Sequence, residues 1–532
     1  MLQVSIEVYK NYNVLFMKVI VIILTCCVLF IQNLGGIALW DPDEPRQAIM
    51  AKEMMDRKDY IHPYLNGKPY LEKPPFYPWM IIAASKLKGT VSEFSSRLPA
   101  ALSATLLVII TYYLGCSMAN PLTGFLSAFI LMLNYQFLSN ARESVMDMTF
   151  AFLIGLTIFL NYLYISKGKR LYFMLSFMPA ALGILTKGPA GLVLPALVTF
   201  FYLINRKELK KFILPLIAGC VISAALSSIW FIIAGPEYIK EFIFRQNITR
   251  YTNAFDHIET MYYYIHKLFF NFLPWSILLP FAIYHAFKRK IWFPLIWFIV
   301  IFLFFEFSTS KRAIYLLSCY PACALLCGIY INEKRAWLLE NRITNILIRS
   351  FAFLLLIIPF FAIFVLNLTN SPVINVFKQE SITLYIYITI LIITGGTFLY
   401  AAAKKSHTLT LSALLFYFVF TGFFYNNFYM PVMDRNFKSP KLITDRIGNL
   451  KDGKDVYTYG FSSAGIIFYV GKPIQIFMNI NEIKDKKNDI LLIVEDEQSQ
   501  HMDKDLNLLF LPVKKAHYEK EHYTVYVRKD GR

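Results

Sequence analysis

The sequence predicts an all-α polytopic membrane protein with a small α/β domain after the last membrane span. Of 532 residues, 57% are hydrophobic and only 17% are charged, whereas soluble domains carry about 25% charged residues. The apolar residues gather in about 13 runs that are long enough to cross a bilayer, which takes about 20 residues. This composition excludes a soluble enzyme, a collagen, a disordered chain and a disulfide-stapled scaffold.

The apolar runs predict the transmembrane helices in order. The first run does not have the form of a cleaved signal peptide, because it is too long and Trp40-Asp41-Pro42-Asp43 follows it instead of a small-residue cleavage site. The runs start near Val19, Ala100, Leu122, Met148, Leu171, Gly191, Phe212, Leu273, Trp292, Ala313, Asn345, Thr383 and Leu409.

The formal charge of +18 would suggest nucleic acid in a soluble protein, but its distribution indicates a membrane. The tail from Lys438 to Arg532 is nearly balanced, with 16 basic and 14 acidic residues, and the rest of the chain holds 37 basic and 21 acidic residues. This excess lies in short loops between apolar runs. We therefore expect membrane lipids, and no nucleic acid, as partners.

The basic loops predict the orientation. Clusters such as Lys167/Lys169/Arg170 and Lys288/Arg289/Lys290 fall in alternate loops, and such loops stay in the cytoplasm. Thirteen spans then place the N-terminus inside and the C-terminus outside. The predicted domains are a membrane domain, 1–437, whose first outer loop at about 40–97 carries the catalytic residues, and an extracytoplasmic α/β domain, 438–532.

The tail alternates short β-like runs with Asp/Asn/Gly/Lys clusters, which is typical of a small α/β domain. A helix is expected over Lys441–Leu450. Strands are expected at Val456–Phe461, Ile466–Val470, Ile490–Val494, Leu508–Val513 and Thr524–Val527.

An acidic segment follows the first span directly. Asp41, Asp43 and Glu44 lie within four residues. Asp43 is placed to cap a helix running to about Arg57, with Arg46 one turn later on the same face. The pattern fits either a solvated helix start or a catalytic carboxylate.

Other polar residues stand near the outer ends of spans. Glu72 and Lys73 precede a double proline, and a lysine at that level either binds a lipid phosphate or extends to the headgroups. Asp147 opens the fourth span and is either a helix cap or a second carboxylate. Lys187 lies between spans five and six and either reaches toward the headgroups or binds an acceptor or phosphate.

These stretches together resemble the bacterial transferases that modify lipid A with 4-amino-4-deoxy-L-arabinose, relatives of the protein O-mannosyltransferases. The resemblance runs from the first span to about Pro321, departs from the family at Pro45 and Gln47, and implies the GT-C membrane fold. The segments that carry it are Asp43-Glu44-Pro45-Arg46, Leu65-Asn66-Gly67, Tyr70-Leu71-Glu72-Lys73-Pro74-Pro75, Phe94-Ser95-x-Arg97-Leu98-Pro99, Met146-Asp147, Leu185-Thr186-Lys187-Gly188-Pro189, Asn247-x-x-Arg250-Tyr251-Thr252, Phe272-Leu273-Pro274-Trp275 and Lys311-Arg312-x-x-Tyr315.

The expected function is transfer of a pentose or hexose, including 4-amino-4-deoxy-L-arabinose, from a polyprenyl phosphate to lipid A or another lipid or glycan of the envelope. Such chemistry needs a base near the acceptor and cations at the departing phosphate. Asp43 is the candidate base, with Glu44 as its rival and Asp147 as a further catalytic carboxylate. Direct displacement should invert the anomeric centre.

The candidate phosphate ligands are the cations near the outer interface and one tyrosine. They are Arg46, Lys73, Arg250 and Tyr315, with Lys187 and Lys311 as weaker candidates for the acceptor or the phosphate. No Gly-rich strand–turn–helix unit occurs in the sequence, so no nucleotide cofactor is expected. The resemblance implies a Zn²⁺ ion shared by Glu72 and His257, and imidazole with carboxylate suits that metal.

Two alternatives remain open. One is a protein O-mannosyltransferase-like enzyme with a Ser/Thr acceptor, and the other is a transporter or flippase for a lipid-linked sugar. Transporters usually hold their charges near the middle of the membrane, whereas this chain places them at the ends of spans. The expected location is the bacterial cytoplasmic membrane, with the active site on its outer, periplasmic side.

Overall fold

The computed structural model describes residues 15–86, 88–253, 256–368, 372–448, 454–479, 482, 490–496, 510–518 and 521–528. The chain forms two compact units. The membrane unit comprises residues 1–32, 71–77 and 99–426, and the second unit comprises residues 33–70, 78–98 and 427–532. This grouping differs from the predicted boundary after residue 437, because most of the loop 40–97 packs with the tail.

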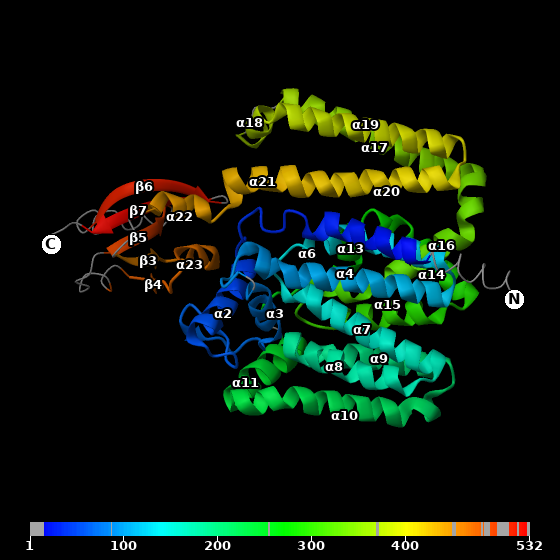
Figure 1. Ribbon diagram of the computed structural model, residues 1–532, viewed down its shortest axis with the longest axis horizontal. Coiled ribbons are helices and arrows are strands. Elements are labelled where there is room, and N and C mark those ends of the chain that lie inside the picture. The colour runs from blue at the N-terminus through cyan, green and yellow to red at the C-terminus, as the bar shows by residue number, and fades with distance from the viewer. Residues whose placement is uncertain are drawn as a thin grey trace. The chain divides into compact units, whose positions relative to one another are not determined.

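Helices dominate the membrane unit, and its long helices run roughly parallel to one another (Figure 1). After the apolar helix Leu15–Ile31, the elements are α4 (Glu93–Met118), α5 (Pro121–Met132), α6 (Tyr135–Asn140), α7 (Met146–Lys167), α8 (Arg170–Lys187), α9 (Ala190–Asn205), α10 (Leu209–Ala234), α11 (Pro236–Tyr238), η2 (Ile239–Thr249), α12 (Arg250–Thr252), α13 (Tyr263–Asn271), η3 (Trp275–Ile277), α14 (Leu279–Arg289), α15 (Trp292–Glu306), η4 (Ala313–Cys319), α16 (Tyr320–Glu340), α17 (Arg342–Leu368), α18 (Pro372–Gln379), α19 (Ser381–Ala403) and α20 (His407–Phe424).

Each of the predicted apolar runs contains a helix, which confirms the polytopic helical class. Among the described residues, 7 helices are long and apolar enough to cross a membrane, and five shorter apolar helices have 10–17 residues. The predicted count of 13 spans is therefore not confirmed. The two counts differ because an apolar run can extend beyond the ends of a helix, whereas the count from the structure uses the length of the helix alone.

A mixed five-stranded sheet forms the centre of the second unit, with strand order β4-β3-β5-β7-β6. β3 is parallel to β4 and β5, and β7 is antiparallel to β5 and β6. The strands are β3 (Asp455–Tyr459), β4 (Gln475–Phe477), β5 (Ile490–Glu495), β6 (Phe510–Tyr518) and β7 (Glu521–Arg528), accompanied by η5 (Tyr425–Tyr429), α21 (Met430–Met433), η6 (Asp434–Lys438), α22 (Lys441–Ile447) and α23 (Ala464–Val470).

The expected α/β tail is thus confirmed for the predicted helix and for four of the five predicted strands, and one strand assignment is wrong. Ile466–Val470 belongs to the helix α23 and not to a strand. Ser463 accepts a hydrogen bond from the Ile466 backbone N–H at 3.0 Å, and Gly471 ends the helix with a φ of 87°. Such a cap and glycine stop favour a helix even over a β-branched run. The short strand β4 was missed.

The first loop contributes its own elements to the second unit. They are α2 (Asp43–Arg57), β1 (Tyr64–Leu65), β2 (Lys68–Pro69) and most of α3 (Phe76–Ser85). The predicted helix end at Arg57 is confirmed. Ile49 of α2 is 3% exposed and shares a core with Ile443 of α22, Ile466 of α23 and Ile493 of β5. Helix α2 is therefore part of the hydrophobic core of the α/β domain.

Candidate active site

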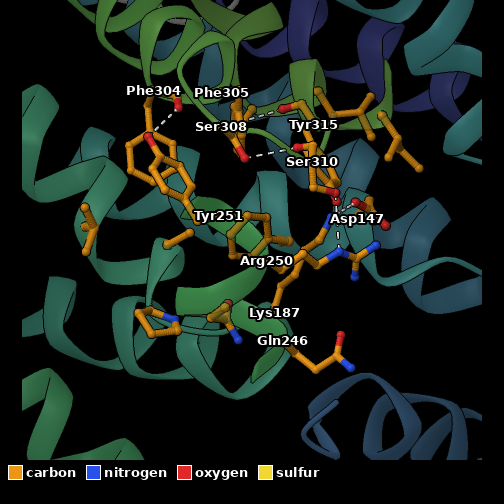
Figure 2. Close-up of a pocket in the computed structure, with 18 of the residues that line it drawn as sticks. Asp147, Lys187, Gln246, Arg250, Tyr251, Phe304, Phe305, Ser308, Ser310 and Tyr315 are labelled. Carbon is orange, nitrogen blue, oxygen red and sulfur yellow. Dashed lines mark hydrogen bonds and ion pairs between the residues drawn. The ribbon is translucent and has the colours of Figure 1, made fainter. Parts of the chain in front are cut away.

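A cavity of about 360 Å³ lies within the membrane unit, where the ends of several helices meet. It brings together five of the residues singled out from the sequence: Lys73, Asp147, Lys187, Arg250 and Tyr315. Figure 2 shows Asp147, Arg250 and Ser310 at one side of this pocket and Tyr251 and Phe304 at the other. The remaining lining comes from Phe150, Ala151, Pro189, Ala190, Val193, Gln246, Asn247, Ile248, Thr252, Phe305, Ser308, Ile314, Leu317 and Ser318.

Asp147 and Lys187 form an ion pair in the pocket. Asp147 lies in the first turn of α7 and Lys187 in the last turn of α8, and their side chains are 12% and 17% exposed. The Lys187 ammonium also lies 4.2 Å from the centre of the Tyr315 ring, a cation–π contact. These contacts give Lys187 a fixed place, which a lysine reaching freely toward solvent would not have.

A glycine makes the turn after Lys187. Gly188 has a φ of 100°, a conformation that L side chains rarely adopt. A Cβ atom there would lie 2.4 Å from the Asn247 side-chain oxygen. Asn247 is itself held by a hydrogen bond from its Nδ2 to the Phe242 carbonyl at 2.7 Å. The Lys187-Gly188-Pro189 sequence therefore lets η2 approach the end of α8.

Arg250 is held from two directions. Its Nη2 lies 2.8 Å from the Asp256 carboxylate, and its Nε donates to the Ser310 hydroxyl at 3.3 Å. The Arg250 side chain is 16% exposed. A guanidinium held by two partners keeps its plane fixed and presents its other N–H groups to one place.

The segment Ser308–Lys311 supports this arrangement. Lys311 donates from its backbone N–H to the His257 carbonyl at 2.9 Å and from Nζ to the Ser308 carbonyl at 2.8 Å. Lys311 is only 5% exposed and is absent from the pocket lining. Lys311 therefore helps to shape this loop, and its weak ligand role stays a prediction.

Lys73 is a partly buried cation of the same pocket. Burial, together with the Lys187 and Arg250 cations, lowers the pKa of Lys73 to about 8, while Asp147 and Glu72 act in the opposite direction. Its Nζ lies 5.8 Å from the centre of the Phe242 ring. An anion entering this pocket would relieve the repulsion among the three cations.

The acidic segment belongs to the second unit. Asp43 and Arg46 form an ion pair at 3.5 Å, and each side chain is 35% exposed, which confirms that they share a helix face. Asp43 is the first residue of α2, and Pro42 occupies the N-cap position that the sequence assigned to Asp43. Glu44, in contrast, is paired with Arg97 at 2.7 Å, and the two side chains are 9% and 2% exposed.

The Zn²⁺ ion predicted between Glu72 and His257 stays a prediction. Among the described residues, no group of three or more His, Cys, Asp or Glu side chains is arranged to hold a metal ion. Glu72 is exposed, and neither Glu72 nor His257 lines the pocket. Zn²⁺ usually takes at least three protein ligands, one more than the predicted pair supplies. Metal analysis of the purified protein tests the Glu72–His257 prediction.

Sequence patterns indicated no role for three residues that the structure places at these sites. They are Asp256 and Ser310, which hold Arg250, and Arg97, which holds Glu44. Asp256 lies only six residues after Arg250 in the chain, and that short spacing was a usable signal. Ser310 and Arg97 are 60 and 53 residues from their partners, so local spacing carries no signal for them.

Comparison with known proteins finds sequence similarity to membrane glycosyltransferases. Residues 72–231 match the family described as dolichyl-phosphate-mannose-protein mannosyltransferase. A protein of Aquifex aeolicus of undescribed function is 34% identical over 334 residues, which cover 61% of this chain and 66% of that protein. The undecaprenyl phosphate-alpha-4-amino-4-deoxy-L-arabinose arabinosyl transferase 1 of Pseudomonas fluorescens is 27% identical over 320 residues, which cover 58% of each chain. The chain thus spans less than two thirds of the length of these relatives.

The solved structures define the fold. ArnT from Cupriavidus metallidurans bound to undecaprenyl phosphate superposes with a TM-score of 0.79 at 18% identity, covering 96% of this chain and 98% of that one. The oligosaccharyltransferase of Archaeoglobus fulgidus gives a TM-score of 0.50 at 12% identity, covering 88% and 65%. The protein therefore has the GT-C fold of polytopic membrane glycosyltransferases. Within that class its sequence is similar to those of the aminoarabinosyl transferases, in agreement with the resemblance found in its motifs.

Proposed function

We propose that the protein transfers a sugar from a polyprenyl phosphate to an envelope acceptor on the outer, periplasmic side of the cytoplasmic membrane. One observation carries the proposal: three cations, Lys73, Lys187 and Arg250, line one pocket that contains the single carboxylate Asp147. Phosphate is the ligand class that such a cluster favours, because charge-assisted hydrogen bonds to phosphate oxygens are strong.

The apolar part of the pocket suits a lipid-linked donor. Tyr251, Phe304 and Phe305 line it together with Val193 and Leu317. A sugar linked to an isoprenoid carries its phosphate next to a long hydrocarbon chain, and sites for such ligands combine an apolar lining with a few polar groups. A soluble nucleotide sugar has no hydrocarbon chain to pack against these apolar residues.

The reaction follows from these groups. An acceptor oxygen attacks the anomeric carbon of the sugar, the bond from that carbon to the phosphate oxygen breaks, and polyprenyl phosphate leaves. Lys73, Lys187 and Arg250 stabilise the negative charge that develops on the departing phosphate. If the acceptor is a hydroxyl, its proton passes to Asp43, and if it is a phosphate, it arrives ionised and Asp43 orients it. A single displacement inverts the anomeric centre.

Asp147 has a different role in this proposal. Its carboxylate forms an ion pair with the Lys187 ammonium. Asp147 instead holds the Lys187 ammonium in the pocket and keeps the cluster from accumulating charge.

The first sugar and acceptor to test are 4-amino-4-deoxy-L-arabinose and lipid A, since several relatives are named as transferases of that sugar. The experiment uses the purified protein in detergent with undecaprenyl phosphate carrying either this sugar or a hexose. Products on lipid A and released undecaprenyl phosphate are measured by mass spectrometry. Transfer of neither sugar to any envelope lipid, while a related transferase is active in parallel, would reject the proposal.

A protein acceptor is the second candidate. The match of residues 72–231 to the mannosyltransferase family favours it. A Ser/Thr-containing peptide with a mannosyl polyprenyl phosphate donor is the corresponding assay. A transporter is distinguished in the same experiments, because detergent-solubilised protein has no second compartment and would form no new glycosidic bond.

A further inference from the structure

The segment Ala38–Asp41, which leads directly into the acidic helix α2, is bonded at every residue to the C-terminal part of the second unit. The Ala38 backbone N–H and the Trp40 indole Nε1 donate to the two oxygens of Asp434, at 3.1 Å and 2.8 Å. The Leu39 backbone N–H donates to the Tyr469 hydroxyl at 2.8 Å. Asp43 follows this segment by two residues.

Asp41 makes the most extensive of these contacts. Its carboxylate accepts from the Gly465 backbone N–H at 2.7 Å and from the Ser463 hydroxyl. The same Ser463 oxygen accepts from the Ile466 N–H at 3.0 Å, so one hydroxyl both caps α23 and holds Asp41. A Cβ atom on Gly465 would lie 2.9 Å from an Asp41 oxygen and 2.6 Å from Pro440. The backbone of α23 thus approaches Asp41 too closely for any larger residue.

Tyr469 links the segment to a second set of charges. Its hydroxyl accepts from the Leu39 N–H and donates to Glu93 at 3.2 Å. Glu93 is also paired with Lys441 of α22 at 2.7 Å. Burial raises the pKa of Tyr469 well above its usual range, so this hydroxyl keeps its proton and remains a donor.

The far side of α2 is fixed by the same domain. Lys52 donates from Nζ to the Gly471 carbonyl at 2.9 Å. Asn66 and Ile474 exchange two hydrogen bonds, from Asn66 Nδ2 to the Ile474 carbonyl at 2.8 Å and from the Ile474 N–H to Asn66 Oδ1 at 2.7 Å. With Ile49 in the domain core, the helix is held along its length.

We infer that the C-terminal α/β domain positions the acidic segment, with Ser463 and Tyr469 as positioning residues for Asp43. The inference rests on the proposed function, since it assigns the domain a part in that same reaction. Its physical basis is that a reacting group displaced by 1 Å can lose about 10²-fold in rate. Two hydrogen bonds to Asp41 and one to Leu39 restrict the backbone from which Asp43 projects.

The test separates turnover from donor binding. Ser463→Ala and Tyr469→Phe should each lower kcat by about 10- to 100-fold. Affinity for undecaprenyl phosphate should stay within about twofold, because the cationic pocket lies in the membrane unit. Ser463→Thr, which keeps a hydroxyl, should restore most of the rate. Asp41→Asn combined with Ser463→Ala should cost little more than either change alone, because both break one contact.

The matched control is Thr524→Ala, which removes another side-chain hydrogen bond of the same domain, from Thr524 Oγ1 to Asp496 at 2.6 Å. It should change neither kcat nor donor affinity. An unchanged kcat in Ser463→Ala and Tyr469→Phe, with an active wild type, would overturn the inference and leave the proposed function standing. An equal loss of kcat in Thr524→Ala would also overturn the inference. A loss of thermal stability in Ser463→Ala and Tyr469→Phe that accounts for their loss of kcat would overturn it as well. A wild type that transfers no sugar would instead reject the proposed function.

Discussion

Arg97 and Glu44 form a buried bidentate ion pair in which each N–H of the guanidinium has an acceptor. Nε and Nη2 donate to the two Glu44 oxygens at 2.7 Å and 2.8 Å. The other three N–H groups donate to the carbonyls of Leu34, Ile37 and Ala38, at 3.1 Å, 2.9 Å and 2.6 Å. Glu44 also accepts from the Trp40 N–H at 3.0 Å. The pair therefore joins α4, the chain leaving the first span and the start of α2.

This pair predicts a large loss of stability when one partner is removed. Arg97→Met should destabilise the protein by roughly 3–5 kcal/mol, because it leaves the Glu44 carboxylate buried without its counter-charge. Glu44→Gln should also destabilise it, though by less, because the amide keeps part of the hydrogen bonding. Thermal unfolding of the detergent-purified variants measures both.

The double variant Arg97→Met/Glu44→Leu tests the reason for the loss. It should recover part of the stability lost in Arg97→Met, because no uncompensated charge remains. A double variant less stable than both single variants would mean that the hydrogen bonds of the pair stabilise the fold beyond the compensation of the two charges.

The same pair decides between Asp43 and Glu44 as the base. Asp43→Asn keeps the side-chain size and should lower turnover at least about a hundredfold with a hydroxyl acceptor, since a positioned base contributes about 10²–10⁴-fold. Its thermal unfolding should match the wild type. Glu44→Gln should instead lower the thermal stability of the protein, because it removes the counter-charge of Arg97. Wild-type turnover in Asp43→Asn together with collapse in a stably folded Glu44→Gln would transfer the role to Glu44.

The lowered pKa of Lys73 predicts a pH-dependent donor affinity. Lys73 is charged below its pKa of about 8, and only the charged form attracts phosphate strongly. Affinity for undecaprenyl phosphate should therefore be high near pH 7 and fall by up to about tenfold per pH unit above 8. Calorimetric titration in detergent between pH 7 and 9.5 measures this fall.

Lys73→Arg is the matched variant for this profile, because its guanidinium stays charged over the whole range. It should bind with a flatter pH dependence. An identical fall in the wild type and in Lys73→Arg would assign the titration to another group.

Asp256, which holds the Arg250 guanidinium, is expected to affect phosphate binding although it is not itself a phosphate ligand. Asp256→Asn removes the charge that holds the guanidinium and should weaken undecaprenyl phosphate binding by about tenfold, equivalent to about 1.4 kcal/mol. Equilibrium binding with the purified variant gives the value. Glu208→Gln, which removes the exposed partner of Arg206 at the other end of α9, is the control and should bind as the wild type does.

The sequence predicted the helical membrane class, the positions of the apolar runs and most strands of the tail. These features depend on local composition and periodicity, which a short window contains. Ile466–Val470 shows the limit of such patterns: its β-branched residues suggested a strand, while the Ser463 cap and Gly471 stop produced a helix. The predicted count of 13 spans stays unconfirmed for a related reason, because hydropathy does not mark where a helix ends.

The sequence by itself also singled out Lys73, Asp147, Lys187, Arg250 and Tyr315 as candidate site residues, because they stand in motifs near the ends of spans, and the structure groups these five in one pocket. Only the tertiary structure decided what each residue contacts. Glu44 meets Arg97 across 53 residues, and Asp41 meets Ser463 across 422 residues. Hydrogen bonds and ion pairs act over about 3 Å in space, so their partners are set by how the chain folds back on itself, and spacing along the chain cannot reveal them.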